Sequence, residues 1–543
     1  MGRTSATATT VRAPPDAALA PAAQAEPEAA HPLVLYNTMT RQKQRFSPRP
    51  DQGSRVSLYC CGVTVYDYSH IGHARVYCCF DVLVRMLRHL GYSVTYVRNF
   101  TDIDDKIIAR AREAGEDPLA LARRFIAEFH ADMAALKCAP PDLEPRATDY
   151  VGAMVAAIQR IVANGHGYEA SGDVFFSVDS VDGYGRLSGR SLEDNRAGER
   201  VAVSTAKRNP ADFVLWKAAK PGEPTWDSPW GPGRPGWHIE CSAMIRELMG
   251  PLIDIHGGGR DLIHPHHDNE LVQSQAACNA CDVERLQNGR DFVRWWMHNG
   301  FVNVDSEKMS KSLGNFFTIR DVLKRYHALS LRWFLVATHY RAAVNYSPRG
   351  LEEASDRLYY IFQTLADAEE AYSAAGDNFS AATRAAAAAD VAAGRGAGGA
   401  LAAEVRSALC DDLNTPMVVS AMSAPLKALN DLLHTKKGKK APNRLATIAG
   451  VCVAVKGALD LLGLQHVAPQ ALLAELRMLA LVRAELSEAD VEAAIAERAA
   501  ARAAKEFAAA DDVRLRLAER GIMLMDSAAG TAWRPGVLDQ SGV

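Results

Sequence analysis

Hydrophobic positions in the first hundred residues alternate between two periodicities. From residue 55, "RVSLYCCGVTVY" is β-branched and aromatic, which predicts a buried strand. In "HARVYCCFDVLVRMLRHLG" apolar residues recur at helical spacing up to Gly91, which predicts a helix. "YSVTYVRNF" then predicts a second strand. A strand, a helix and a strand at this spacing form a βαβ unit, which implies an α/β fold with a Rossmann-type, doubly wound parallel sheet.

The pattern changes further along the chain. Residues 140–235 contain "SGDVFFSVDS" and "KPGEPTWDSPWGPGRPGW", which predict an inserted module of short strands and long loops. The parallel-sheet pattern resumes with "LIDIHGGG" and "FVRWWMHNGFVNV". After about residue 350 the spacing is helical, with a predicted low-complexity loop at 382–400 and a basic loop at 435–444. A last unit, from about residue 471, predicts helices and then a strand and turn in "GIMLMDSAAGTAWRPG".

Composition narrows the class of protein. The 543 residues are 48% apolar and 23% charged, as in an ordinary soluble globular protein of about two to four domains. No apolar run approaches the roughly 20 residues that span a bilayer, so we expect no membrane partner. The net charge of −3 neither suggests nor excludes nucleic acid, because a large enzyme can keep a local basic path. The ten cysteines are too sparse for a disulfide scaffold and indicate reduced thiols.

The first 32 residues are rich in alanine and proline and predict a disordered extension. Their three acidic residues offset two arginines, whereas an organelle transit peptide is basic and poor in acids. We therefore expect a cytoplasmic protein.

Metal-ligating residues gather in "GGGRDLIHPHHDNE", residues 257–270. If the chain after Pro265 is helical, His266 and Glu270 share one face and make half of a zinc site. The alternative is a polar helix start with solvated side chains. "CNAC", Cys278 to Cys281, has the form of half a zinc knuckle, but the chain has no second CxxC.

Two further motifs suit phosphate chemistry. "SHIGHAR" puts His70, Gly72 and His73 at the turn between strand and helix, where phosphate binds and where imidazoles can donate hydrogen bonds to developing charge. "EKMSKSLGN" puts Lys308 and Lys311 on a loop, and two mobile ammonium groups suit a migrating pyrophosphate. Taken alone, the first also fits a polar turn and the second a solvated face.

Together these motifs resemble those of class I aminoacyl-tRNA synthetases. More narrowly, "YCCGVTVYDYSHIGHARVY", "VRNFTDIDDKI", "RPGWHIECSAM" and "DIHGGGRDLIHPHHDNE" resemble the cysteinyl-tRNA synthetase family, and the resemblance runs from about residue 34 to 534. It implies activation of L-cysteine by Mg²⁺-bound ATP and transfer to the 3′ end of tRNA(Cys). The implied catalytic residues are His70, His73, Lys308 and Lys311. The implied ATP-binding residues are His70, Gly72, His73, Gly258, Asp261, Lys308 and Lys311.

The resemblance also implies one zinc ion per subunit. The implied ligands are Cys61, Cys241, His266 and Glu270. The expected role of zinc is to select cysteine over serine. A purely apolar pocket would bind these near-isosteres with free energies that differ by only about 1–3 kcal/mol, whereas zinc binds the soft thiolate of cysteine directly. Four protein ligands usually make a closed structural site, so cysteine binding needs a fifth position or a weak bond to Glu270. Gly62, Thr101 and Trp237 are implied to contact the amino acid, although Trp237 also fits a core position.

The resemblance further implies how the chain is divided. The expected units are a disordered extension (1–32), the two halves of a Rossmann catalytic domain (33–139 and 236–300) around an inserted connective module (140–235), a KMSKS loop and stem-contact region (301–350), an all-α helical tRNA-binding domain (351–470) and a small C-terminal anticodon-binding domain (471–543). Asp526, Trp533 and Arg534 are candidates for tRNA contacts, although Trp533 also fits a packing role. We expect a monomer.

Two other functions remain open. A cysteine ligase on the same catalytic core would pass cysteinyl-adenylate to a small amine and would lack the anticodon unit. An inactive paralogue that binds RNA would need neither the histidine and lysine motifs nor the zinc ligands. Failure to form the adenylate would favour this last function.

Overall fold

The computed structural model describes residues 32–191, 205–278, 292–304, 307–308, 316–377, 379–465, 468–527 and 530–538. Its central element is a parallel sheet of four strands in the order β10-β9-β3-β4. The strands are β3 (Arg55–Thr64), β4 (Ser93–Thr101), β9 (Ile253–Gly259) and β10 (Val293–Asn299). This arrangement confirms the four predicted strands and the predicted parallel sheet.

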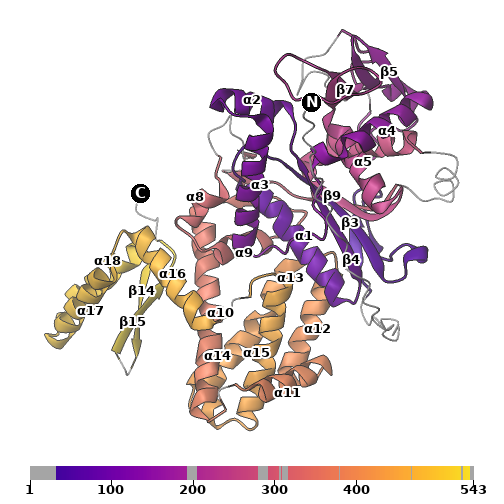
Figure 1. The fold of residues 1–543 in the computed structure, drawn as a ribbon. Coiled ribbons are helices and arrows are strands. Elements are labelled where there is room, and N and C mark those ends of the chain that lie inside the picture. The colour runs from indigo at the N-terminus through magenta and orange to yellow at the C-terminus, as the bar shows by residue number, and fades with distance from the viewer. Residues whose placement is uncertain are drawn as a thin grey trace, which may run out of the picture. The chain divides into compact units, whose positions relative to one another are not determined.

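Helices cover both faces of this sheet (Figure 1). Leu58 and Cys60 pack in one core with α1 (Ile71–His89), whereas Tyr59 and Cys61 pack in another core with α5 (Trp237–Met249). Successive residues of a strand point to opposite faces, so the adjacent cysteines are separated and only Cys61 faces α5. The crossover from β4 continues into α2 (Asp105–Ala114) and α3 (Pro118–Ala135).

The inserted module is an antiparallel sheet with a helix. Its strands are β5 (Gly167–Ala170), β6 (Asp173–Phe176), β7 (Phe213–Ala218) and β8 (Gly233–Pro235), in sequential order. The short strands confirm the prediction, but α4 (Val151–Ala163) was not expected. Its buried Met154, Ile158 and Ile161 have helical spacing and pack against the module's sheet, which explains the helix.

The chain beyond about residue 350 is mostly helical, as predicted, and two shorter helices already precede this point. These helices are α8 (Ile319–Leu323), α9 (Ala328–Val336), α10 (Pro348–Ala374), α11 (Ala381–Ala392), α12 (Gly396–Cys410), α13 (Thr415–Ala421), α14 (Ser423–His434) and α15 (Arg444–Leu461). The predicted loop at 382–400 is wrong. Alanine is the best helix former, so the segment forms α11 and the start of α12, and only the positive φ of Gly394 and Gly396 makes a turn.

The C-terminal unit has the predicted helices followed by a hairpin. It contains α16 (Pro469–Ala484), α17 (Glu488–Ala503), α18 (Phe507–Glu519), β14 (Ile522–Ser527) and β15 (Gly530–Pro535). Two small sheets complete the fold, one of β1 (Val34–Asn37) and β2 (Gln42–Arg45), the other of β11 (Val302–Val304), β12 (Glu307–Lys308) and β13 (Val344–Tyr346). Among the described residues, no helix combines the length and apolar character needed to cross a membrane. The predicted extension lies outside the described residues, except for its last position.

Candidate active site and metal centre

The four predicted metal ligands come together from three parts of the chain. Cys61 lies near the end of β3 and Cys241 lies in α5. His266 lies in a short turn (Ile263–His267) that leads into α6 (Asp268–Ala276), which carries Glu270. The sulfur atoms of Cys61 and Cys241 lie 3.8 Å apart, and Sγ of Cys241 lies 3.7 Å from Nε2 of His266. Oε1 of Glu270 lies 2.9 Å from the same Nε2 and 3.6 Å from Sγ of Cys61. We call this closed set the donor ring.

The donor ring fits zinc. All four residues are buried, and they offer two sulfurs, one imidazole and one carboxylate. Tetrahedral zinc holds sulfur at about 2.3 Å, which puts two sulfurs about 3.8 Å apart, as they are here. Calcium and magnesium prefer sets of oxygen ligands, so the two sulfurs disfavour them.

His267 is a further donor that sequence reasoning missed. Its Nε2 lies 3.2 Å from Sγ of Cys61 and 3.8 Å from Oε1 of Glu270. With Cys61, His266 and Glu270 it forms a group whose ligand atoms all lie within 4.8 Å of one another. Its Nδ1 lies 2.7 Å from Nε2 of His298 on β10. The sequence did contain a sign of this second histidine, namely the adjacent pair of His266 and His267. On a helix, the residues three and four positions before Glu270 both lie close to its side chain.

The charges within the donor ring attract a cation. Burial raises the pKa of Cys61 well above its usual value. Burial also raises the pKa of Cys241, but hydrogen bonds with Cys61 and His266 outweigh it and lower this pKa to about 6. Burial raises the pKa of Glu270 as well, yet His256 and His266 bring it well below its ordinary value. Burial lowers the pKa of His266, but Glu270 and Cys241 outweigh it and raise this pKa to about 10. The shifts at Cys241 and Glu270 favour their deprotonated forms, which are the forms that bind a metal.

Neighbouring side chains orient the ring. Nε2 of His256 lies 2.8 Å from Oε2 of Glu270, which leaves Oε1 directed at the other donors. Gly258 on β9 is part of the same wall, since a Cβ atom there would lie 3.4 Å from Cε1 of His267 and 3.7 Å from Cβ of Cys61. Gly258 was predicted to bind ATP, and the structure brings it beside the donor ring. Asp261, the other ATP candidate of this segment, is exposed on the following turn (Arg260–Leu262).

Each of the three predicted amino-acid contacts is linked to the donor ring or to a residue next to one of its ligands. Gly62 donates its N–H to Oδ1 of Asn99 at 2.8 Å, and a Cβ atom at Gly62 would lie 1.5 Å from the Asn99 carbonyl oxygen. Trp237 stacks on His266 with ring centroids 4.3 Å apart and planes 17° apart, so it touches a predicted ligand directly. Thr101 is buried and donates its hydroxyl to Oε2 of Glu240 at 2.6 Å.

Glu240 is a buried carboxyl group that the sequence analysis did not single out. It precedes Cys241 on α5 and is 1% exposed. Burial raises its pKa well above the ordinary value, and the Thr101 hydrogen bond only partly opposes this. Glu240 accepts the hydrogen bond from the Thr101 hydroxyl through Oε2 and so fixes the position of Thr101.

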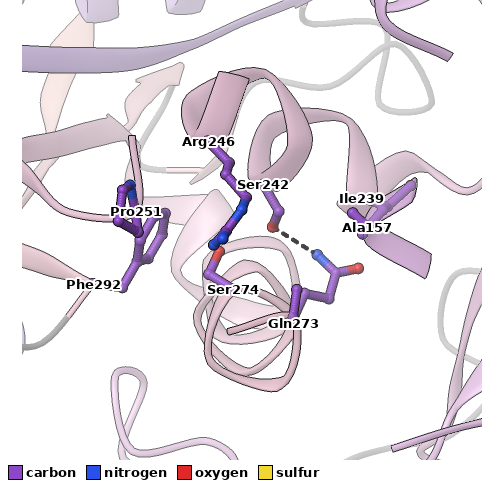
Figure 2. A pocket seen from close by; sticks show the side chains of 9 residues that line it. Ala157, Ile239, Ser242, Arg246, Pro251, Gln273, Ser274 and Phe292 are labelled. Atoms are coloured by element: carbon purple, nitrogen blue, oxygen red, sulfur yellow. Dashed lines mark hydrogen bonds between the residues drawn. The ribbon is translucent and has the colours of Figure 1, made fainter. Parts of the chain in front are cut away.

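Figure 2 shows a small cavity beside α5 and α6, which is lined by Ser242 and Arg246 of α5 and by Gln273 and Ser274 of α6. Gln273 of α6 donates to the carbonyl oxygen of His238 at 2.8 Å and to Oγ of Ser242 at 3.0 Å, which ties α6 to α5. The cavity beside this link measures about 10 Å³, which is room for about one water molecule. It is a packing gap that is too small for a substrate.

His70 and His73 form a stacked pair at the start of α1. Their ring centroids lie 3.7 Å apart, and His70 is the N-cap residue of the helix. Nδ1 of His70 accepts the Gly72 N–H at 3.0 Å, and Nδ1 of His73 accepts the His70 N–H at 3.4 Å. We infer that each neutral ring carries its proton on Nε2, so both can donate to an anion bound at the helix N-terminus.

The lysine motif is joined to this turn through its flanks. The backbone of Lys308 lies on β12, where it pairs with Asn303 of β11; the side chain of Lys308 and the whole of Lys311 lie outside the described residues. Where the description resumes, Ile71 donates its N–H to the carbonyl of Phe317 at 3.2 Å. Ile319 likewise donates to the carbonyl of Ser69 at 2.9 Å. Segments some 240 residues apart thus meet beside His70.

Cys281 of the CNAC motif also lies outside the described residues.

The three candidate tRNA contacts differ in their surroundings. Trp533 is 3% exposed and packs in the core of the C-terminal unit, with the Arg477 guanidinium 4.3 Å above its ring, which favours the packing role over base stacking. Asp526 accepts two hydrogen bonds from Arg498, both at 2.8 Å. Arg534 is paired with Asp356 of α10. Both charges already have partners within the protein.

Comparisons with known proteins agree with these features. A family model described as the class I (C) tRNA synthetase catalytic domain matches residues 48–356, and one described as the cysteinyl-tRNA ligase anticodon binding domain matches residues 484–534. The chain is 52% identical to a chloroplastic/mitochondrial cysteine–tRNA ligase of Arabidopsis thaliana over 93% of this chain and 86% of the relative. It is 48% identical to a cysteine–tRNA ligase of Anaeromyxobacter sp. over 92% and 99%.

Among solved structures, the fold is similar to that of a Mycobacterium tuberculosis methionyl-tRNA synthetase in complex with methionyl-adenylate. The TM-score is 0.54 at 16% identity, and the match covers 80% of this chain and 94% of the other. At this identity the likeness concerns the fold alone.

Proposed function

Because the chain belongs to the cysteine–tRNA ligase family of class I aminoacyl-tRNA synthetases, we propose that it activates L-cysteine with ATP and transfers the cysteinyl group to the 3′ end of tRNA(Cys). The observation that carries this proposal is the buried donor ring of Cys61, Cys241, His266 and Glu270. These residues would hold one zinc ion. When bound, zinc supplies a soft Lewis acid that prefers the thiolate of cysteine to the hydroxyl of serine.

The side chains packed around the donor ring leave too little room for an amino acid larger than cysteine. Trp237 lies against His266, and the backbone at Gly62 touches that of Asn99, so little space is left beside the ring. Glu240 and Thr101 form a polar pair on the same side as Cys241. We assign Gly62, Thr101 and Trp237 to the binding of the substrate amino acid, with Glu240 and Asn99 holding two of them in position.

The chemistry at the phosphates needs positioning and charge rather than a protein nucleophile. The cysteine carboxylate attacks the α-phosphorus of Mg²⁺-bound ATP and pyrophosphate leaves. His70 and His73 donate hydrogen bonds from Nε2 to phosphate oxygens at the N-terminus of α1. Lys308 and Lys311 neutralise the departing pyrophosphate, and Gly258 and Asp261 complete the proposed nucleotide site. The adenylate then transfers its cysteinyl group to the tRNA.

The C-terminal unit favours a tRNA acceptor over a small amine. Residues 484–534 match an anticodon-binding family model, and they form helices and a hairpin with their own core around Val491, Val513 and Trp533. A ligase that acts on a small amine has no use for such a unit. We further propose that the protein acts in the cytoplasm as a monomer.

ATP–pyrophosphate exchange tests the proposal. The purified protein is offered cysteine or serine, before and after zinc removal and after zinc is restored. We expect exchange with cysteine alone, its loss with the metal and its return with zinc, followed by charging of tRNA(Cys). Exchange without tRNA charging would favour the small-amine ligase. A folded, zinc-loaded protein that gives no exchange would contradict the proposal and favour the inactive RNA-binding paralogue.

A further inference from the structure

A group of lysines stands exposed at the end of α14. Lys436, Lys437, Lys439 and Lys440 are all exposed, and they surround a short 3₁₀ turn at Gly438–Lys440. Within the part of the chain that the structure describes, none of the four forms an ion pair. We call residues 436–440 the lysine turn.

The lysine turn is held in a defined shape. Thr435 donates its hydroxyl to the carbonyl of Asp431 at 2.7 Å and accepts the N–H of Gly438 at 2.9 Å. The N–H of Lys439 donates to the carbonyl of Thr435 at 3.0 Å. Gly438 is buried, and a Cβ atom there would lie 1.9 Å from the carbonyl oxygen of Asp431. The backbone therefore closes tightly on the end of α14 and holds the four lysines on one short turn.

This concentration of charge is unusual for the chain. Residues 427–444 carry six lysines or arginines and one carboxylate, although the whole chain has a net charge of −3. Like charges repel when they are crowded on a short turn, and no carboxylate among the described residues pairs with these lysines to offset the repulsion. A polyanion with closely spaced phosphates would offset it.

We propose that the lysine turn binds phosphate groups of the tRNA backbone. The proposal rests on the proposed tRNA substrate and adds a contact site to it. In the chain, the turn lies between the residues that match the catalytic-domain model and those that match the anticodon-binding model, and its positive charge is complementary to the phosphates of a tRNA. Lysine ammonium groups carry charge without the geometry that reads bases, so the contact contributes affinity and not sequence recognition.

The test compares three full-length proteins: the wild type, a variant with all four lysines changed to alanine (K436A/K437A/K439A/K440A), and a charge-preserving variant with all four changed to arginine. Binding of tRNA(Cys) is measured by fluorescence anisotropy over a series of salt concentrations. Each lost phosphate contact lowers the slope of log Kd against log salt by roughly 0.7–0.9. We expect the alanine variant to bind about tenfold or more weakly at low salt, with a slope smaller by roughly 2–4. The arginine variant should bind like the wild type.

Two readouts separate this inference from the proposed function. ATP–pyrophosphate exchange with cysteine should be the same in all three proteins, because it needs no tRNA, whereas KM for tRNA in aminoacylation should rise only in the alanine variant. If the wild type charges tRNA(Cys) and the alanine variant binds with an unchanged Kd and salt slope, the inference is overturned and the proposed function stands. If the wild type charges no tRNA, the proposed function itself fails. Binding to anionic vesicles provides a further comparison. If the alanine variant loses binding to vesicles but binds tRNA as the wild type does, the inference is also overturned.

Discussion

Nε2 of His266 lies 2.9 Å from Oε1 of Glu270, whereas Nε2 of the adjacent His267 lies 3.8 Å from the same oxygen. Only His266 also approaches Cys241, at 3.7 Å, and so closes the donor ring. The structure thus favours His266 as the ligand and His267 as the neighbour that supports Cys61.

Replacing each histidine in turn tests this assignment. We expect His266→Asn to lose stoichiometric zinc, because the ring then lacks one of four donors. His267→Asn should keep zinc while its affinity falls by about 10–100-fold, as is typical when a supporting residue is removed. Metal analysis after dialysis against graded chelator measures both. Equal zinc loss in the two variants would show that His267 is a ligand as well.

The close approach of Gly62 to Asn99 predicts a strict requirement for glycine. In Gly62→Ala the new Cβ would lie 1.5 Å from a backbone oxygen, which can give way only if two strands separate. We expect a loss of stability of about 1–3 kcal/mol or more and a large rise in KM for cysteine in the exchange assay. Gly152→Ala on α4 is the matched control, since a Cβ there meets nothing within 4 Å. A Gly62→Ala protein with wild-type KM would refute the assignment.

A buried ion pair joins the catalytic unit to the helices that follow. Arg332 of α9 pairs with Asp81 of α1 and donates to the carbonyls of Leu462 at 2.8 Å and Leu136 at 2.9 Å. Arg332→Ala leaves a buried carboxylate without this partner, and we expect the free energy of unfolding to fall by about 3–5 kcal/mol in urea titrations. In contrast, Arg349→Ala removes an exposed pair and should cost about 0.5 kcal/mol or less.

The burial of Trp533 predicts a structural role. We expect Trp533→Ala to destabilise the C-terminal unit by about 3–5 kcal/mol and to lower tRNA charging without changing ATP–pyrophosphate exchange. Trp533→Phe should preserve most of both properties, because it fills much of the same space. Thermal melts followed by circular dichroism, together with charging assays, measure these effects. A Trp533→Ala protein that melts like the wild type but no longer binds tRNA would restore the base-stacking role.

Asp105 gives a predicted pH dependence. Burial raises its pKa, but Lys217 and Arg234 outweigh this and lower the pKa to about 2. A depressed pKa stabilises the folded state above the unfolded pKa of about 3.9, and this contribution is lost as the pH falls through the folded value. Because the Asp105 side chain is 55% exposed, solvent screening keeps the contribution below about 1 kcal/mol. The Tm difference between wild type and Asp105→Asn should shrink as the pH falls from about 5 toward 2. A constant difference would contradict this.

Local patterns were sufficient for most elements of the fold. The β-branched run at 55–64 and the helical spacing up to Gly91 predicted β3 and α1, because hydrophobic periodicity reports directly which face of an element is buried. The segment 382–400 differs from its prediction, because low complexity suggests a loop whereas its many alanines favour a helix. The helix α4 was missed because the surrounding glycines and prolines dominated the pattern.

The sequence by itself determined the kinds of donor and their local spacing: a His-x-x-x-Glu pair must share a helix face, and a family resemblance named two cysteines to complete it. Only the tertiary structure decided that Cys61 and Cys241, 180 residues apart, bring their sulfurs to 3.8 Å, and that His267 joins them. It also decided that Trp533 is buried. The physical reason is that periodicity depends on neighbours within one element, whereas a metal site and a core depend on how separate elements pack, which no local pattern encodes.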